Sequence, residues 1–186
     1  MKSAKIIVTG PVRAGTTSFI RSLSEIAVLS TERKLGNGSS QNGRGEATVA
    51  LDFGRITISR ELVLYLFGTP GEEPDTLACG PLAEGPIGVI VVVDATRPAS
   101  VEGAAEILEF LLENSDVPLA VAANRMPQDD EGRVSKLRED LRLPAEVPVV
   151  ACEATQRVSA KRVVLALLDR IIDTTPATAG ANMEAE

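Results

Sequence analysis

The sequence is poor in the residues that carry much of enzyme and nucleic-acid chemistry. It contains no histidine and no tryptophan, one tyrosine, four phenylalanines and two cysteines. Its formal net charge is −7 at pH 7, which argues against binding to nucleic acid or to an anionic membrane, because few basic side chains remain to neutralise phosphates. Cys79 and Cys152 lie far apart in the sequence, so we expect thiols in the core or in loops rather than a disulfide or a metal site.

Long hydrophobic runs and targeting signals are also missing. The longest apolar run, residues 87–93, is far too short to span a bilayer, and neither end carries a leader or a lipidation motif. We therefore expect a cytoplasmic protein without a membrane anchor. With 186 residues, of which 44% are hydrophobic, the chain is long enough for one domain over residues 1–173, followed by a disordered tail over 174–186.

What the sequence does contain is an alternation of short apolar runs with helical stripes. Strands are expected at 5–9, 48–59, 62–67, 87–93, 119–123 and 147–151, and helices from about residue 16 and over 101–112, 133–141 and 159–173. Two stretches rich in glycine or proline, 30–46 and 68–86, predict loops, the first of them mobile. This order predicts a doubly wound α/β sheet of six strands, mostly parallel, with one antiparallel edge hairpin.

The first strand is followed by a glycine-bounded loop of the phosphate-binding type. The template is Gly, four residues, Gly, Lys and then Ser or Thr, and Gly10, Gly15 and Thr17 fit it, whereas Thr16 stands in the position of the lysine. Backbone N–H groups of such a loop, together with the positive end of the following helix, form an anion site without any side chain. Because ligands of doubly wound sheets bind at the carboxyl ends of the strands, we expect the site at this edge.

Five loops at that edge, including 10–17, fall where a Ras-type GTPase keeps its nucleotide motifs, and the sequence resembles the bacterial Ras-like small GTPases of the gliding-motility and conservon type. It reads Gly-Pro-Val-Arg-Ala-Gly-Thr-Thr-Ser at 10–18 and Gly-Thr-Pro-Gly-Glu at 68–72, where members of that group typically read Gly-Pro-Val-Gly-Ala-Gly-Lys-Thr-Thr and Gly-Thr-Pro-Gly-Gln. The resemblance covers residues 3–173. It implies a Ras-like P-loop NTPase fold, guanine nucleotide and Mg²⁺ as cofactors if any are bound, and a small roadblock-type protein as partner.

The resemblance also assigns residues to the nucleotide. It implies contacts from Gly10, Arg13, Ala14, Gly15, Thr16, Thr17, Ser18, Thr48, Gly71, Asn124, Arg125 and the backbone N–H of Ala154, with Thr17 and Thr48 meeting the Mg²⁺ ion. Two of these assignments have an alternative. Arg13 either folds over the phosphates or projects into solvent, and Thr48 is either the threonine of the first switch or merely the first residue of a strand.

Several motif positions depart from the family pattern. Thr16 offers one neutral hydrogen bond in place of an ammonium, and loss of one partner of a buried charged pair costs about 3 kcal/mol, or about a hundredfold in affinity. Glu72 replaces the glutamine that orients the attacking water; an ionised carboxylate can only accept, so we expect slow hydrolysis. Pro127 replaces the aspartate that reads the guanine edge. Gly68 stands where Ras proteins carry a metal-linked aspartate, but the bacterial group commonly lacks that aspartate as well.

These departures favour a degenerate small GTPase, which acts as a signalling or scaffold module and binds guanine nucleotide weakly or not at all. The alternative is a working nucleotide switch with slow or partner-assisted hydrolysis, in which Arg13 or an arginine of a partner replaces the missing lysine. A P-loop kinase or a metallochaperone is disfavoured, because the sequence shows no carboxylate cluster at an acceptor site, no histidine and no pair of cysteine ligands.

Overall fold

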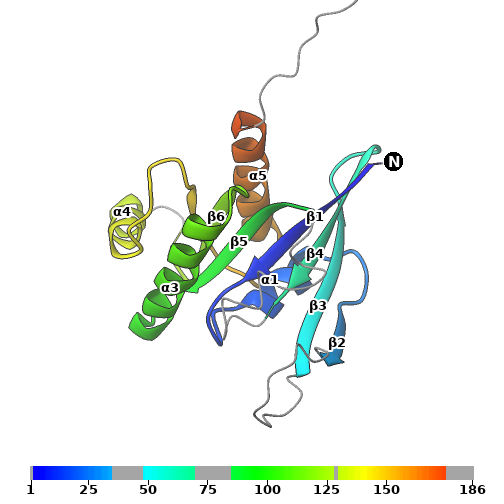
Figure 1. Ribbon diagram of the computed structural model, residues 1–186, viewed down its shortest axis with the longest axis horizontal. Helices are drawn as coiled ribbons and strands as arrows, with labels where there is room; N and C mark the ends of the chain where they lie inside the picture. The colour runs from blue at the N-terminus through cyan, green and yellow to red at the C-terminus, as the bar shows by residue number, and fades with distance from the viewer. Residues whose placement is uncertain (1, 35–47, 70–84, 128–129, 175–186) are drawn as a thin grey trace, which may run out of the picture.

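The computed structural model describes residues 2–34, 48–69, 85–127 and 130–174 (Figure 1). Seven strands form one sheet in the order β2-β3-β4-β1-β5-β6-β7. The strands are β1 Lys2–Thr9, β2 Leu29–Lys34, β3 Thr48–Thr57, β4 Leu62–Gly68, β5 Pro86–Asp94, β6 Leu119–Asn124 and β7 Val149–Cys152. The helices are α1 Thr16–Leu23, α3 Pro98–Asn114, α4 Glu131–Asp140 and α5 Arg157–Thr174.

The five strands from β4 to β7 in sheet order run parallel to their neighbours, and helices cover both faces of this part of the sheet (Figure 1). Ile6 and Val8 of β1 belong to a core that the sheet shares with α1 and α5, whereas Ile7 between them belongs to a core shared with α3 and α4. Because successive side chains of a strand point to opposite faces, β1 and β5 must be apolar on both sides, which is why they read as unbroken hydrophobic runs.

The sheet has one strand more than the six predicted, and two antiparallel pairs instead of one. β3 and β4 form the predicted hairpin, but β2 adds an edge strand that pairs with β3 from Leu29 opposite Phe53 to Lys34 opposite Thr48. The prediction of a loop was therefore wrong for residues 30–34. An edge strand obtains its backbone hydrogen bonds from one neighbour and needs no continuous apolar face, so its polar composition did not prevent pairing. Residues 35–46 lie outside the described residues.

The remaining elements confirm the doubly wound α/β class. The predicted helices and strands occur with their ends shifted by a few residues, the usual uncertainty of such boundaries. Most of the predicted loop 68–86 and all but the first residue of the predicted tail lie outside the described residues. Within the described part of the chain, no helix is long and apolar enough to cross a membrane.

Two leucines on α3 test which face of this helix supports the fold. Leu108 is fully buried, whereas Leu112, one turn later, is 41% exposed. Leu108→Ala leaves a cavity under the helix and should lower the free energy of unfolding by about 2–5 kcal/mol, while Leu112→Ala should lower it by less than about 1 kcal/mol. Urea unfolding followed by circular dichroism measures both. Equal losses in the two variants would contradict the orientation of α3.

Candidate nucleotide-binding site

The loop between β1 and α1 follows a path that excludes a side chain at two positions. A Cβ atom on Gly10 would lie 2.2 Å from the carbonyl oxygen of Val92 on β5. Gly15 has a φ of 110°, and a Cβ atom there would lie 2.4 Å from the side-chain nitrogen of Asn124. Glycine meets both demands, since it tolerates positive φ and allows close approach of the backbone. The phosphate-loop template is therefore present as a backbone shape.

The helix that follows the loop presents its N-terminus at the predicted anion site. α1 begins at Thr16, and Gly15 at its N-cap provides no side-chain cap. The buried residue Ala14 donates its N–H to the carbonyl of Pro11 at 2.9 Å, which closes the loop on itself, and Ser18 lies partly exposed in the first helical turn. Because Thr16 carries no charge, the attraction of this end of α1 for an anion comes from backbone dipoles.

Arg13, in the middle of the loop, adopts the left-handed backbone region with a φ of 65°. A non-glycine residue adopts this region at a cost in free energy that glycine does not have. The backbone at residue 13 would therefore suit the glycine that the family carries in this position. The side chain of Arg13 is exposed, and it makes no hydrogen bond or ion pair with any described residue. The side chain thus projects into solvent here, and a contact of Arg13 with phosphates stays a prediction.

Thr17 donates a hydrogen bond from its hydroxyl to the carboxylate of Asp52, with an oxygen-to-oxygen distance of 2.6 Å. Asp52 lies on β3 directly opposite Gly68, the last residue of β4. A Cβ atom on Gly68 would lie 2.6 Å from Cδ1 of Ile20 and 3.0 Å from Cβ of Asp52. Asp52 thus brings a carboxylate to Thr17 from the neighbouring strand, and Ile20 and Asp52 together crowd the space that a side chain on Gly68 would need.

Sequence reasoning missed Asp52. Its signal was a single carboxylate within the apolar and β-branched run of the hairpin, and the register of the hairpin was needed to place it beside Thr17. A hydroxyl and a carboxylate at hydrogen-bond distance are a fitting donor set for Mg²⁺, which is usually held by one or two carboxylates together with phosphates and waters. No group of three or more carboxylate, cysteine or histidine ligands occurs among the described residues.

Asn124 connects three loops at the carboxyl edge of the sheet. Its amide nitrogen donates to the carbonyl of Ala14 at 2.8 Å, and its amide oxygen accepts the backbone N–H groups of Ala154 at 2.9 Å and Arg125 at 3.0 Å. Asn124 is only 3% exposed. The N–H of Ala154, which the resemblance assigned to the base, is therefore already donated to Asn124 in this structure.

Arg125 pairs with the carboxylate of Asp94, which is fully buried at the end of β5. The other oxygen of that carboxylate accepts the backbone N–H of Thr96 at 3.1 Å and its hydroxyl at 2.7 Å. Arg125 reaches this position with a φ of 60° and keeps half of its side chain exposed. Its guanidinium is thereby held against β5, and its stem is the part left to cover a base.

Pro127 and Asp130 follow Asn124 in the stretch where the family carries its base-reading aspartate. Pro127 is exposed and offers neither a charge nor a side-chain hydrogen bond. Asp130, the next described acidic residue, caps α4 by accepting the N–H of Arg133 at 3.0 Å, and its other oxygen pairs with the guanidinium of Arg133 at 3.1 Å. The N–H of Ala154 is engaged by Asn124 as well.

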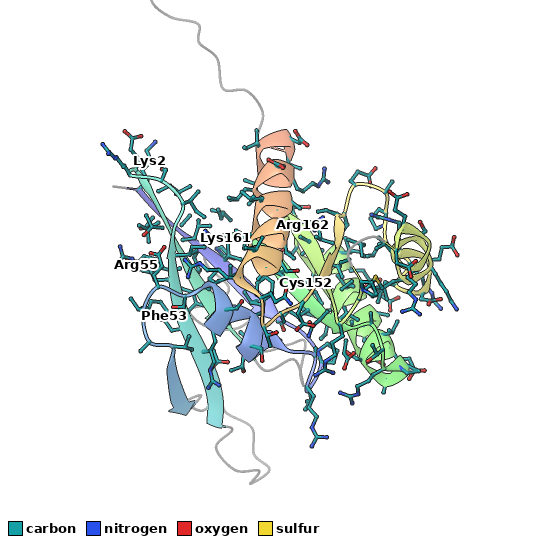
Figure 2. All side chains as sticks on the ribbon, turned by 180° about the vertical axis from the view of Figure 1, so that it is seen from behind. Lys2, Phe53, Arg55, Cys152, Lys161 and Arg162 are labelled. Atoms are coloured by element: carbon teal, nitrogen blue, oxygen red, sulfur yellow. The ribbon has the colours of Figure 1, made fainter. Side chains whose placement is uncertain are left out.

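The thiol at this edge belongs to the core. Cys152 ends β7 and is fully buried beneath α5 (Figure 2). Burial raises the pKa of the Cys152 thiol to about 11, although a hydrogen bond with Ser159 acts in the opposite direction. A buried thiol that stays protonated at neutral pH is a packing residue and not a nucleophile. The expectation of a core thiol is confirmed for Cys152, and Cys79 lies outside the described residues.

Further predicted site residues have no structural test. Gly71 and Glu72 lie outside the described residues. Thr48 is the first residue of β3 and pairs with Lys34 of β2. Its place at the start of a strand is compatible with both alternatives, so a contact of Thr48 with Mg²⁺ stays a prediction.

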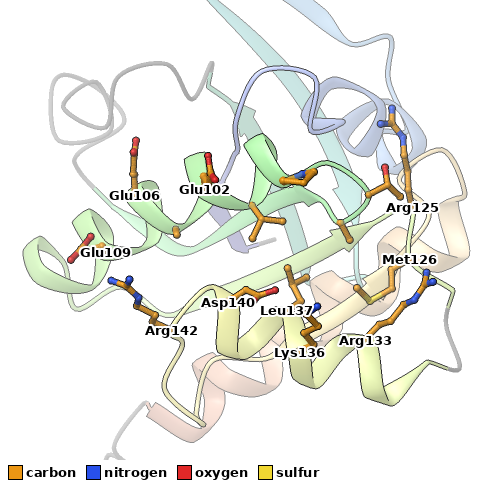
Figure 3. A pocket seen from close by; sticks show the side chains of 15 residues that line it. Glu102, Glu106, Glu109, Arg125, Met126, Arg133, Lys136, Leu137, Asp140 and Arg142 are labelled. Carbon is orange, nitrogen blue, oxygen red and sulfur yellow. The ribbon is translucent and has the colours of Figure 1, made fainter.

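A groove of about 700 Å³ lies between α3 and α4, away from the phosphate loop (Figure 3). One wall carries Glu102, Glu106 and Glu109 of α3, and the facing wall carries basic residues of α4. The groove reaches the carboxyl edge of the sheet, where Thr96 and Arg125 contribute to its lining. None of the phosphate-loop residues lines it, so the groove is not the predicted nucleotide pocket.

The hydrogen bonds of Asn124 make it a structural residue whether or not a nucleotide binds. Asn124→Ala leaves the carbonyl of Ala14 and the N–H of Ala154 buried without this partner, which should lower the free energy of unfolding by about 3 kcal/mol. Asn114→Ala is the control, because Asn114 is exposed and makes one bond to its own helix; its loss should stay below about 1 kcal/mol. Urea unfolding of both variants measures these losses. An Asn124→Ala variant with the free energy of unfolding of the wild type would contradict the prediction.

Comparison with known proteins supports the fold alone. No protein-family model matches the sequence, and no curated protein matches it. In three dimensions, 1144 chains of solved structures match. One of them is the G domain of the FeoB iron transporter of T. maritima, which aligns over 91% of this chain and 99% of its own length with a TM-score of 0.61 and 16% identity. The chain therefore has the fold of a P-loop GTPase domain.

Proposed function

We propose that this chain is a degenerate Ras-like GTPase domain, which acts as a signalling or scaffold module and binds guanine nucleotide weakly or not at all. The observation that carries the proposal is the base corner. Asn124 uses its amide on the backbone of Ala14, Arg125 and Ala154, and Pro127 supplies no acceptor for the guanine edge. A site that depends on hydrogen bonds for selectivity loses it when those groups are absent or engaged.

The phosphate side of the site supports the same proposal. Among the described residues, the position of the family's lysine holds the neutral Thr16, and the exposed Arg13 makes no hydrogen bond or ion pair there. The loop amides and the end of α1 still favour an anion, but that attraction is weak beside a charged partner. We therefore expect phosphate groups to be held loosely.

The metal corner is the part that fits its ligand. Thr17 and Asp52 would hold a Mg²⁺ ion beside the loop, where the ion would neutralise negative charge on bound phosphates. This pair supports a second candidate function, a nucleotide switch with slow or partner-assisted turnover. In that case the missing positive charge comes from Arg13 or from an arginine of the partner.

The partner belongs to the proposal as well. The resemblance to bacterial Ras-like GTPases of the gliding-motility and conservon type suggests a small roadblock-type protein, and we propose a complex of that kind. A module that works by binding needs a partner surface and no turnover, so complex formation and a defective nucleotide pocket are compatible.

Titration calorimetry with GTP and Mg²⁺ tests the proposal. The wild-type chain should bind in the micromolar range or weaker. Thr16→Lys together with Pro127→Asp should tighten binding by about a hundredfold, because a charged partner for the phosphates returns, and should favour GTP over ATP. Arg13→Ala tests the second candidate function, the nucleotide switch. If Arg13 replaces the missing lysine, this variant should lose nucleotide binding.

Controls keep the outcomes apart. Denaturing the purified chain and chromatographing the supernatant shows whether nucleotide was already bound, which would mask a titration. Submicromolar affinity of the wild-type chain for GTP, with measurable hydrolysis, would overturn the proposal and favour the switch. No gain in the Thr16→Lys, Pro127→Asp variant would show that these two side chains are not what weakens binding.

Asp52 gives a prediction about the metal. In the Thr16→Lys, Pro127→Asp background, Asp52→Asn should reduce the enhancement of GTP binding by Mg²⁺ about tenfold, because an amide replaces the anionic metal ligand. Asp116→Asn, at an exposed position in the loop before β6, is the control and should leave the enhancement unchanged. Titrations with and without Mg²⁺ measure this effect, and equal enhancement in both variants would remove Asp52 from the metal site.

A further inference from the structure

The outer face of α5 carries a row of exposed apolar side chains. Val158, Leu165 and Ile172 are 77%, 53% and 69% exposed, and they follow one another at intervals of seven residues. The other exposed large hydrophobic side chains of the described residues lie apart in three loops and on α3: Val12, Ile26, Ile58 and Leu112. Single exposed apolar residues are normal on a protein surface, but a regular row on one helix is not.

The spacing places the three side chains on one stripe. An α-helix has about 3.6 residues per turn, so residues seven apart are displaced by only about 20° around the axis. The side of α5 packed on the sheet is formed by a separate set of buried residues, Ser159, Ala160, Val163, Val164 and Leu167. The helix is therefore apolar on two opposite faces, and a seven-residue period is the period with which one helix packs along another.

We propose that α5 pairs with α5 of a second copy of the chain, in antiparallel orientation, about a two-fold axis that passes between the two Leu165 side chains. In this arrangement Leu165 of each copy meets Leu165 of the other, and Val158 of each copy meets Ile172 of the other. A two-fold dimer uses the same patch on both subunits. The contact between Val158 and Ile172 therefore occurs twice, once on each side of the central Leu165 pair.

The charges that flank the stripe favour this orientation. The exposed charged residues beside the stripe are basic in the first half of α5, with Lys161 and Arg162, and acidic in the second half, with Asp169 and Asp173. Figure 2 labels Lys161 and Arg162 on this helix. Antiparallel pairing sets the basic half of each copy beside the acidic half of the other, whereas parallel pairing sets like charges side by side.

Residue geometry brings one charge pair into register. Arg162 and Asp169 lie on the same side of the apolar stripe, and they are three and four residues from Leu165 in opposite directions along α5. The two-fold axis therefore places Arg162 of one copy at nearly the height of Asp169 of the other, and it does so twice.

A single helix pair buries less than the roughly 1,600 Å² of a standard interface, so we expect a dimer of micromolar stability.

The first experiment measures the mass of the full chain in solution. Sedimentation equilibrium over about 1–300 μM should show a monomer–dimer equilibrium, and Leu165→Glu should weaken dimerisation at least thirtyfold because two buried carboxylates would face each other. Leu112→Glu, an exposed leucine on α3, is the matched control and should dimerise as the wild type does. Both substitutions are at exposed positions, and circular dichroism with thermal unfolding checks that each variant is folded.

The second experiment tests the orientation. A short bismaleimide should crosslink the Leu165→Cys variant to itself. Val158→Cys and Ile172→Cys should each crosslink poorly alone, but an equimolar mixture of the two should give a mixed dimer. The unsubstituted chain is the control for its own cysteines.

The outcomes decide the proposal. Efficient crosslinking of Val158→Cys to itself would overturn the antiparallel arrangement. A wild-type chain that is monomeric throughout the concentration range, or a Leu165→Glu variant that dimerises normally, would overturn the pairing of α5 and leave the stripe to a different protein or to a lipid surface. None of these measurements uses nucleotide, so they stand or fall separately from the proposed function.

Discussion

The carboxyl edge of the sheet depends on the fit between Asn124 and Gly15. A side chain at residue 15 would collide with the amide of Asn124, and the space left by its absence lets that amide reach the loop, the end of β6 and the turn after β7. A buried amide must have its hydrogen-bonding groups satisfied, and here the satisfying groups are all backbone. One side chain thus holds together three segments that are far apart in the sequence.

This constraint separates the residues that build the edge from those that would perform chemistry on it. Gly10, Gly15 and Asn124 are required by close contacts that exist without a ligand. Thr16 and Pro127 make no such contact; the first starts a helix that backbone bonds sustain, and the second is exposed. A chain can therefore lose a lysine and a base-reading aspartate at little cost in stability, whereas loss of the glycines would disturb the fold. Motif residues that persist for structural reasons are weak evidence of activity.

The same distinction explains what could be predicted from the sequence. The parallel strands were predictable because burial on both faces demands unbroken apolar runs, and α3 and α5 because their buried stripes repeat with the helical period. β2 was not predictable, because an edge strand that pairs with the backbone of β3 needs no apolar pattern of its own. Asp52 was missed because its meaning depends on which residue lies opposite it in the hairpin. The engagement of Ala154 by Asn124 follows only from the distance between two strand ends.

α5 shows how a correct prediction can be incomplete. The sequence analysis assigned the apolar stripe that packs on the sheet, and the structure places a second stripe, from Val158 to Ile172, on the opposite side. A surface helix ordinarily has one apolar face, because a second one exposes hydrophobic area to water and adds nothing to the stability of the domain. Among the exposed large apolar side chains of the described residues, those of α5 alone follow one another at a regular interval, and this regularity is what favours a contact with another helix.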